Sequence, residues 1–430
     1  MDDLTRRALL GIGAGVAVGA LAECGAGGRL STAGTVLPKA TQTTPPTGST
    51  STLSRVAQPP TQPPSQTTQP SPRTTASPDG STAYTGRQPN QPLPQRLLPG
   101  QRPPQFVVVS WDGAGETGAQ LFSHYREVAR RLRGSMTFFV TGLYFLPQSQ
   151  RNLYHPPQHP VGASDIGFLS DSSVHATIQQ VGAAWTDGHE IGTHFNGHFC
   201  GPRGVKRWSP QDWDSEIDQA IGFVSSWRTT TGFTDLPALP FDYARELVGA
   251  RTPCLEGQAN LLRSSRAKQW RYDSSGTGRQ VWPTRFPGSA MWNIPMQSIP
   301  FPGHRFQVIS MDYNIMYNQS GGPQGAASNR PLWKAQARDA FLAGFDRAYT
   351  GNRAPLIIGN HFERWNGGIY MEAVESAITE MAAHPDVRFV SFRQLVDWLE
   401  AQDSRVLSKL QALGVGQAPP AQDWAAVTAS

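Results

Sequence analysis

Short apolar runs alternate with helical patterns from residue 106 to residue 401, and this alternation constrains the fold more than any other feature of the sequence. Continuous runs of β-branched and aromatic residues are typical of parallel strands that are covered on both faces. Strands are expected at 106–109, 135–142, 188–193, 355–358 and 387–391, and helices at 118–133, 174–187, 370–384 and 392–401. This order predicts an α/β fold, either a parallel barrel or a doubly wound sheet, with its functional residues at the C-terminal strand ends.

A further helix is expected to begin at Ser209. Ser209 fits the N-cap, Pro210 the first helical position and Asp212 the third, which is a strong signal for a helix start. Apolar residues at 217, 220, 221 and 224 then give this helix one face that can pack on a core.

Residues 31–105 have a composition that does not form a core. They hold 16 of the 36 prolines, one aromatic residue (Tyr84) and one acid (Asp79), among many Thr, Ser and Gln residues. Such segments bury too little apolar surface to offset the entropy of folding. They also carry six basic residues, so their charge equals the +5 of the whole chain and the remainder is formally neutral. Net charge therefore gives no indication of a nucleic-acid partner, and we expect none.

Residues 1–24 have the pattern of an export signal. Arg6 and Arg7 precede a small, apolar run over residues 8–22, and its fifteen residues are fewer than the ~20 that span a bilayer. The arginine pair resembles a twin-arginine signal. Two processing sites remain open, because residues 20–22 (Ala-Leu-Ala) form a cleavage signature and residues 21–24 resemble a lipobox that would lipidate Cys24. We expect an exported protein, extracellular or in the cell envelope, whose only membrane contact is made through Cys24.

The chain is therefore expected to have four segments. These are an export signal (1–24), a Pro/Thr/Ser-rich disordered linker that acts as a tether or a spacer (25–105), a catalytic domain (106–402) and a C-terminal tail (403–430). Of the three cysteines, Cys24 is the lipidation candidate, which leaves Cys200 and Cys254 as an even pair. In an oxidising compartment this pair is a candidate disulfide, and two buried free thiols are the alternative.

Two histidines four positions apart, His194 and His198, follow the strand expected at 188–193. Neutral imidazole is a preferred zinc ligand, so two rings at this spacing can meet on one cation. The pair is a weak signal alone, but three other strand ends also finish in reactive groups, namely Asp112, Arg251 and His361. Together these residues indicate a catalytic site with a metal.

These segments resemble the motifs of a known family. Residues 137–140 (TFFV), 188–198 (GHEIGTHFNGH), 251–253 (RTP) and 356–361 (LIIGNH) resemble, in order, those of NodB-like polysaccharide deacetylases, carbohydrate esterase family 4 (CE4). The long spacing to the last motif, and residues 345–356, are most similar to the chitin-deacetylase branch. The resemblance covers residues 104–402. It implies a distorted parallel (β/α) barrel of the NodB-homology type, a divalent metal such as zinc, and removal of acetyl groups from N-acetylated sugar polymers.

The resemblance also implies residue roles. His194 and His198 match the metal ligands, His361 the acid that protonates the leaving amine, and Arg251 the arginine that orients the base. In the first motif, residues 110–114 read SWDGA where the family has T-F-D-D-G or T-F-D-D-A. Keeping the register makes Asp112 the base and puts Gly113 in place of the metal-binding carboxylate. The alternative register makes Asp112 the metal ligand and leaves no base.

Four further residues are candidates for the substrate groove or its surroundings. Glu116 is the nearest acid that could complete the metal site, and Asp312 lies where the family has an acid near the catalytic histidine. Trp111 and Trp365 are candidates for the groove wall, because an aromatic ring offers a flat apolar surface to a sugar. The insertion at 255–305 is expected to be a loop that walls the same groove.

The function expected from these features is that of an exported, metal-dependent hydrolase. It would remove N-acetyl groups from an envelope or extracellular polysaccharide that contains N-acetylglucosamine. The alternative is a non-catalytic glycan-binding protein that lost the metal carboxylate at Gly113. Hydrolysis of another amide or ester also stays open, because a fold does not fix a substrate.

Overall fold

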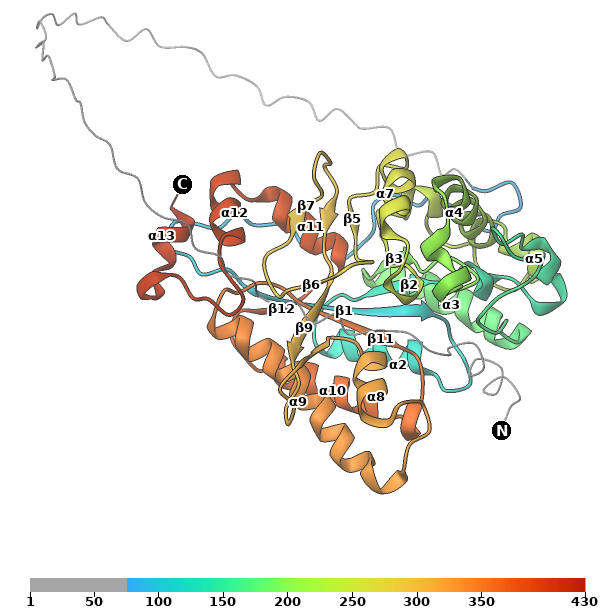
Figure 1. Cartoon of the computed structure of the whole chain (residues 1–430). Helices are drawn as coiled ribbons and strands as arrows, with labels where there is room; N and C mark the ends of the chain where they lie inside the picture. Colours follow the sequence, from blue (N-terminus) through green and yellow to red (C-terminus); the bar gives the residue numbers. More distant parts are fainter. Residues whose placement is uncertain (1–75, 430) are drawn as a thin grey trace, which may run out of the picture. The chain divides into compact units, whose positions relative to one another are not determined.

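A computed structural model of the chain describes residues 76–429 (Figure 1). Within these residues a nine-stranded sheet has the order β11-β1-β2-β3-β4-β5-β8-β7, with β12 also paired to β1. All neighbours are parallel except β7 and β8. The sheet is curled into a half-barrel, so the fold is mixed α/β, as predicted. Its strands are β1 Gln105–Ala114, β2 Thr137–Val140, β3 Glu190–Thr193, β4 Gly249–Ala250, β5 Tyr272–Asp273, β7 Thr284–Arg285, β8 Trp292–Asn293, β11 Leu356–His361 and β12 Val387–Phe389.

Helices cover the sheet, and a small second sheet lies beside it. The helices are α2 Leu121–Arg131, α3 Asp171–Asp187, α4 Pro210–Ser225, α5 Trp227–Thr231, α6 Tyr243–Glu246, α7 Gln258–Ala267, α8 Asp312–Ser320, α9 Arg330–Thr350, α10 Ile369–Ala382, α11 Phe392–Ala401, α12 Ser404–Gln411 and α13 Trp424–Thr428. The second sheet has the order β10-β9-β6 and contains β6 Thr277–Gly278, β9 Met296–Pro300 and β10 Gln307–Ile309. Among residues 76–429, no helix combines the length and apolar character needed to cross a membrane.

Strand β1 explains why the apolar runs of this sequence show no polar alternation. Val107, Val109 and Trp111 belong to one buried hydrophobic cluster, whereas Phe106 and Val108 belong to another. Successive side chains of a strand point to opposite faces, so both faces of β1 are covered. The strand is therefore apolar at every position until its C-terminal end.

The predicted linker is wrong for residues 76–104, which form an N-terminal arm that packs on the domain (blue in Figure 1). The indole of Trp227 donates a 2.7 Å hydrogen bond to the carbonyl of Ser81, which is fully buried. The backbone N–H of Ala83 donates to the carbonyl of Leu239 at 2.8 Å. Composition excluded a core of the arm's own, but it did not exclude anchoring through backbone hydrogen bonds.

The rest of the arm lies along residues that immediately precede strands. The side-chain amides of Gln88 and Gln91 donate to the carbonyls of His189 (2.6 Å) and Gly188 (3.0 Å), just before β3. Arg102 pairs with Asp386 at 3.1 Å, just before β12. The arm therefore lies at the N-terminal ends of the parallel strands. The predicted export signal with Cys24, and residues 25–75 of the predicted linker, lie outside the described residues.

Two other segments are more ordered than expected. The predicted C-terminal tail contains α12 and α13, which bury Val406, Leu410 and Val427. The insertion at 255–305 is not a loop, because it forms α7 and the strands β5 to β9. Through β5 and β8 it extends the parallel sheet beyond β4.

Candidate active site

The reactive residues expected at strand ends do meet in the structure. Asp112 lies near the end of β1, Arg251 directly follows β4, His194 directly follows β3, and His361 ends β11. Asp112 and His361 are register partners in the parallel pair formed by β1 and β11. Partners in register point to the same face of a parallel sheet, so these two side chains lie beside each other. The C-terminal edge of the sheet thus carries a cluster of titratable groups.

Arg251 holds the carboxylate of Asp112. Its Nη1 donates to Oδ1 of Asp112 and to Oγ of Ser110, both at 2.8 Å, and its Nη2 donates to Oγ of Ser274 at 2.8 Å. Both charged side chains are almost completely buried, with exposed fractions of 0% for Arg251 and 3% for Asp112. The pair is therefore shielded from solvent and fixed in orientation.

Gly359 makes room for this guanidinium. A Cβ at position 359 would lie 3.2 Å from Nη1 of Arg251 and 2.9 Å from Cε of Met311. A side chain at position 359 would therefore crowd Met311 and the guanidinium of Arg251. The glycine in the motif Gly359-Asn360-His361 thus belongs to the packing of the site.

Asp112 is ionised at neutral pH. Burial raises the pKa of Asp112, but the charge of Arg251, with smaller contributions from His194 and His361, outweighs burial and holds this pKa below its ordinary value. Its Oδ2 accepts no hydrogen bond from the residues that the structure describes. This oxygen is free to accept a proton.

His361 is held by a buried carboxylate, that of Asp312 at the start of α8. Nδ1 of His361 lies 2.8 Å from Oδ1 of Asp312, and the backbone N–H of His361 donates to Oδ2 at 2.8 Å. Burial lowers the pKa of His361, but Asp312, through its charge and hydrogen bond, outweighs burial and raises this pKa to about 9. The imidazole is therefore protonated at neutral pH, with Nε2–H available to a substrate. The structure thus agrees with the expectation that Asp312 lies next to His361.

His194 presents an unprotonated nitrogen to the site. Its Nδ1 donates to the carbonyl of Arg251 at 2.8 Å, which leaves the lone pair of the neutral ring on Nε2. Nε2 is buried and has no partner among the described residues. Burial also lowers the pKa of His194 to about 4, so the ring is neutral at physiological pH. A buried nitrogen lone pair without a partner fits a cation.

His198 lies next to His194, with 5.1 Å between the ring centroids. Burial lowers the pKa of His198 to about 3, so this ring is also neutral. The loop that carries it is tight, because Phe195 and His198 both have left-handed backbone conformations (φ 61° and 55°). Two neutral imidazoles in this arrangement can share one divalent cation.

Among residues 76–429, no group of three donors combines this histidine pair with a carboxylate. Gly113 has no side chain, and its φ of 62° accompanies a shift in the register between β1 and β2. Asp112 is held by Arg251, and Glu116 instead accepts a 2.9 Å hydrogen bond from the backbone N–H of Ser123 in α2. In each carboxylate one oxygen has such a partner and the other has none among the described residues, so the expectation that Asp112 or Glu116 serves as a metal ligand stays a prediction. The donor set fits a cation held by two histidines.

Trp111 and Glu116 are predicted to line the substrate groove, but the structure buries both of them. Trp111 is not in a groove. It is fully buried, and its ring stacks on that of Phe362 with 4.5 Å between centroids, because β1 directs it to the face opposite Asp112. Glu116 is only 4% exposed and is likewise not a groove residue. Trp365, in the short helix Trp365–Gly367, is partly buried, and its ring centroid lies 5.2 Å from that of His361, so it borders the acid.

The sequence pattern missed Ser274 and the tyrosines of α8. Ser274 follows a two-residue strand inside the insertion, which is too short to produce a periodic signal. Tyr313 and Tyr317 lie four residues apart on α8 with 6.2 Å between ring centroids, and Tyr313 is 5.7 Å from Trp365. The sequence signal that could have identified the two tyrosines is their spacing of four residues, which places both side chains on the same face of a helix.

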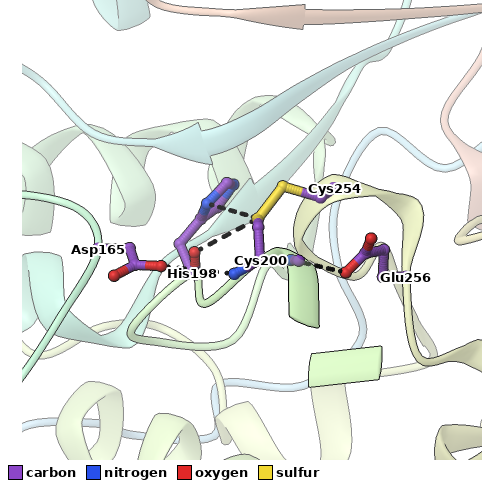
Figure 2. Close-up of a disulfide and its surroundings, with 6 residues drawn as sticks. Asp165, His198, Cys200, Cys254 and Glu256 are labelled. Carbon is purple, nitrogen blue, oxygen red and sulfur yellow. Dashed lines mark hydrogen bonds between the residues drawn. A yellow bond between two sulfur atoms is a disulfide. The ribbon is translucent and has the colours of Figure 1, made fainter. Parts of the chain in front are cut away.

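A disulfide lies beside His198 (Figure 2). It joins Cys200, in the loop after His198, to Cys254, three residues after Arg251, with 6.1 Å between the Cα atoms. Nδ1 of His198 lies 3.7 Å from Sγ of Cys200. The loops that follow β3 and β4 are therefore covalently connected next to the site.

No protein-family model matches the sequence, and no curated protein matches it. Among solved structures, the chain is similar to a protein from Mycobacterium smegmatis described as a polysaccharide deacetylase (14% identity, 72% of this chain, 95% of that chain, TM-score 0.41). It is also similar to a mutant of the peptidoglycan deacetylase PdaC from Bacillus subtilis (11% identity, 71% and 94% covered, TM-score 0.35) and to a CE4 family pseudoenzyme from Bacillus anthracis (10% identity, 73% and 71% covered, TM-score 0.37). Similarity at this level assigns no activity, so the chemistry has to follow from the site's own residues.

Proposed function

We propose that this chain is a metal-dependent hydrolase that removes N-acetyl groups from a polysaccharide containing N-acetylglucosamine. One observation carries the proposal. A carboxylate held ionised by Arg251 and an imidazole held protonated by Asp312 stand side by side, in register, on β1 and β11. An ionised base next to a protonated acid is the pair that amide hydrolysis requires.

Asp112 acts as the general base. Its carboxylate takes a proton from the water that attacks the acetyl carbonyl, while the bond between that water oxygen and the carbonyl carbon forms. Arg251, whose guanidinium also donates to Ser110, fixes the direction in which Asp112 receives the proton. The low pKa of Asp112 keeps it ionised, so it is ready to accept this proton over a wide pH range.

His361 acts as the general acid. Its protonated imidazole gives a proton to the amide nitrogen as the bond between carbon and nitrogen breaks, so the products are acetate and the free amine of the sugar. Asp312 keeps the ring charged and oriented before the reaction and stabilises it in this position. His194 and His198 would hold the divalent cation, with zinc favoured by their nitrogen ligands. When bound, such a cation supplies the Lewis acidity that polarises the acetyl carbonyl.

Release of acetate from N-acetylglucosamine oligomers tests the proposal. We expect Asp112→Asn and His361→Gln each to lower the rate by about 100-fold or more, the range typical for loss of a general base or acid. Matched controls are Asp386→Asn and His175→Gln, because Asp386 and His175 also form a carboxylate–arginine and a histidine–carboxylate pair, but at the surface. Full activity in both site variants would refute the assignment.

The second candidate function is that of a non-catalytic glycan-binding protein. Gly113 favours this candidate, because position 113 has no carboxylate that could complete a metal site. Metal analysis and oligosaccharide binding separate the two. Binding of the oligomer by protein with far less than one metal ion per chain, and with no acetate released after zinc is added, would support the second candidate.

We also propose that the chain is exported through residues 1–24 and reaches the envelope or the medium, with Cys24 as a lipid anchor. A Cys24→Ser variant that stays in the membrane fraction would contradict the anchor.

A further inference from the structure

We infer that the reduced form of the chain binds a thiophilic divalent cation through His198, Cys200 and Cys254. One donor atom from each of these residues lies within 4.8 Å of the other two, and this is the one group of three such donors among residues 76–429. In the oxidised form the two sulfurs are bonded to each other, as Figure 2 shows, and a disulfide sulfur is a poor ligand. The two forms are therefore mutually exclusive states of one site.

The two loops that carry the donors are also held by contacts other than the disulfide. The backbone N–H of Cys200 donates to Oδ2 of Asp165 at 3.4 Å, and that of Gly201 donates to Oε2 of Glu256 at 3.0 Å. Glu256 lies two residues after Cys254, so its bond to Gly201 crosses between the same two loops as the disulfide. Opening the disulfide should leave the three donors close together.

The chemistry of the site follows from the donor set. A dithiol reductant breaks the S–S bond by delivering two electrons and two protons, which gives two thiols on the chain and a disulfide in the reductant. Cys254 is exposed, so the reductant can reach its sulfur. One imidazole and two thiolates form a ligand set that zinc and cobalt favour, with a fourth position left for water, and binding of the cation releases both thiol protons.

This site would share His198 with the histidine pair of the proposed catalytic centre. Nδ1 of His198 faces the sulfur of Cys200, and the same ring neighbours His194. The two proposed sites would therefore share the ring of His198. The existence of the thiolate site itself does not depend on the proposed function.

Titration with Co²⁺ tests the inference, because thiolate ligation produces a charge-transfer band in the near ultraviolet that histidine ligation does not. The full chain is used as Cys24→Ser, which removes the third thiol, either oxidised or after reduction with dithiothreitol and anaerobic removal of the reductant. We expect the band to saturate at one Co²⁺ per reduced chain and to be absent from the oxidised chain. Cys254→Ser and Cys200→Ser should each abolish it, and circular dichroism spectra should verify that both variants fold.

Two histidine variants complete the test. His198→Gln should weaken Co²⁺ binding by more than the roughly 10- to 100-fold that loss of an outer hydrogen-bond partner costs a metal site. His194→Gln should leave the band and the affinity unchanged. No band in the reduced chain, a band that survives in both folded cysteine variants, or loss of the band in His194→Gln alone would overturn the inference. Deacetylation is not measured, so this outcome is independent of the proposed function.

Discussion

Asp112 and His361 are neighbours across two strands, yet their partners hold them in opposite protonation states. Arg251 keeps the carboxyl group ionised, and Asp312 keeps the imidazole charged, although burial alone would neutralise both groups. At the scale of single residues, the site is therefore defined by its two partners as much as by the acid and the base.

The first prediction concerns Asp312. In Asp312→Asn the largest influence that raises the pKa of His361 is lost, while burial and the smaller effects of Asp112 and Glu363 remain, so this pKa should fall from about 9 toward neutrality. The alkaline limb of the rate profile should move to lower pH by the same amount, with the largest loss of rate between pH 7 and pH 9. Rate against pH, together with NMR titration of His361, measures the shift.

The same variant has a predictable effect on stability. Because the pKa of His361 is raised on folding, its pairing with Asp312 stabilises the protein fully below pH 6.5, and this contribution is lost as pH rises through about 9. The melting temperatures of wild type and Asp312→Asn should thus differ most near pH 6 and converge above pH 9. Asp235→Asn, which removes the partner of the surface residue His175, is the control.

The second prediction concerns Gly113. A Cβ at this position would meet only Oγ1 of Thr141, at 3.6 Å, and aspartate tolerates a left-handed backbone better than most residues do. Gly113→Asp should therefore add a carboxylate to the histidine pair and raise zinc affinity at least about tenfold (~1.4 kcal/mol). Gly113→Ala carries the same backbone strain without a carboxylate, so it should not raise the affinity. Competition with a chromophoric chelator, under oxidising conditions, measures both.

The residues of the site could be predicted from the sequence to the extent that each ends a recognisable strand. Asp112, His194, Arg251 and His361 satisfy this condition, and the structure brings them together. The surroundings of Trp111 could not be predicted in this way, because the face to which a strand directs a side chain depends on its register. Similarly, hydrogen bonds to Ser123 and Thr177 determine where Glu116 lies, and nothing in the local sequence indicates them.

Among the elements, β1, β4 and the segment after β5 are tied together through one side chain. Arg251 follows β4 and donates to Ser110 and Asp112 in β1 and to Ser274 after β5. The insertion at 255–305 therefore extends the sheet and also supplies Ser274, one of the hydrogen-bond partners of Arg251.

The third prediction follows from this arrangement. Arg251→Met leaves the carboxylate of Asp112 buried without a partner, which should lower the free energy of unfolding by about 3–5 kcal/mol. Adding Asp112→Asn should recover part of that loss, since the uncompensated charge is then removed. Lys334→Met removes an exposed pair with Glu372 and should cost less than about 1 kcal/mol. Urea unfolding of the four proteins measures this, and a double variant no more stable than Arg251→Met would contradict it.

The sequence predicted well those helices and strands whose ends or periodicity are marked by recognisable residue patterns. Helix α4 begins at Pro210 with a complete capping box between Ser209 and Asp212, and α11 spans 392–401 as expected. The short strands β5 and β8 could not be predicted, because two residues carry no periodicity and their pairing depends on β4.

At the scale of the whole molecule, the N-terminal arm shows the limit of composition as a guide. Its proline content and its single aromatic residue, Tyr84, exclude a core of its own. Its order comes instead from partners far away in sequence, such as Trp227 for Ser81 and Asp386 for Arg102. No local pattern in residues 76–104 could identify these partners.

The fourth prediction concerns Asp79, whose carboxylate accepts a hydrogen bond from Thr229 and so connects the start of the arm to the domain. Burial raises the pKa of Asp79, but hydrogen bonds from Ser81, Thr229 and Ser77 outweigh it and lower this pKa to about 2. Asp79→Asn should loosen the arm and speed amide hydrogen exchange over residues 76–98 at pH 7. Because the pKa is lowered on folding, the stabilisation is present above pH 3.8 and lost as pH falls through about 2, so the melting temperatures of variant and wild type should converge there. Unchanged exchange at pH 7 would contradict this role.

The arm crosses the strand ends that lie opposite Asp112 and His361. A label or a solid support can be joined to the arm, for example a fluorophore or an affinity handle. It would then lie at the N-terminal ends of the strands, opposite the C-terminal ends that carry the candidate site. The protein could be immobilised there with the edge that carries Asp112 and His361 facing away from the support.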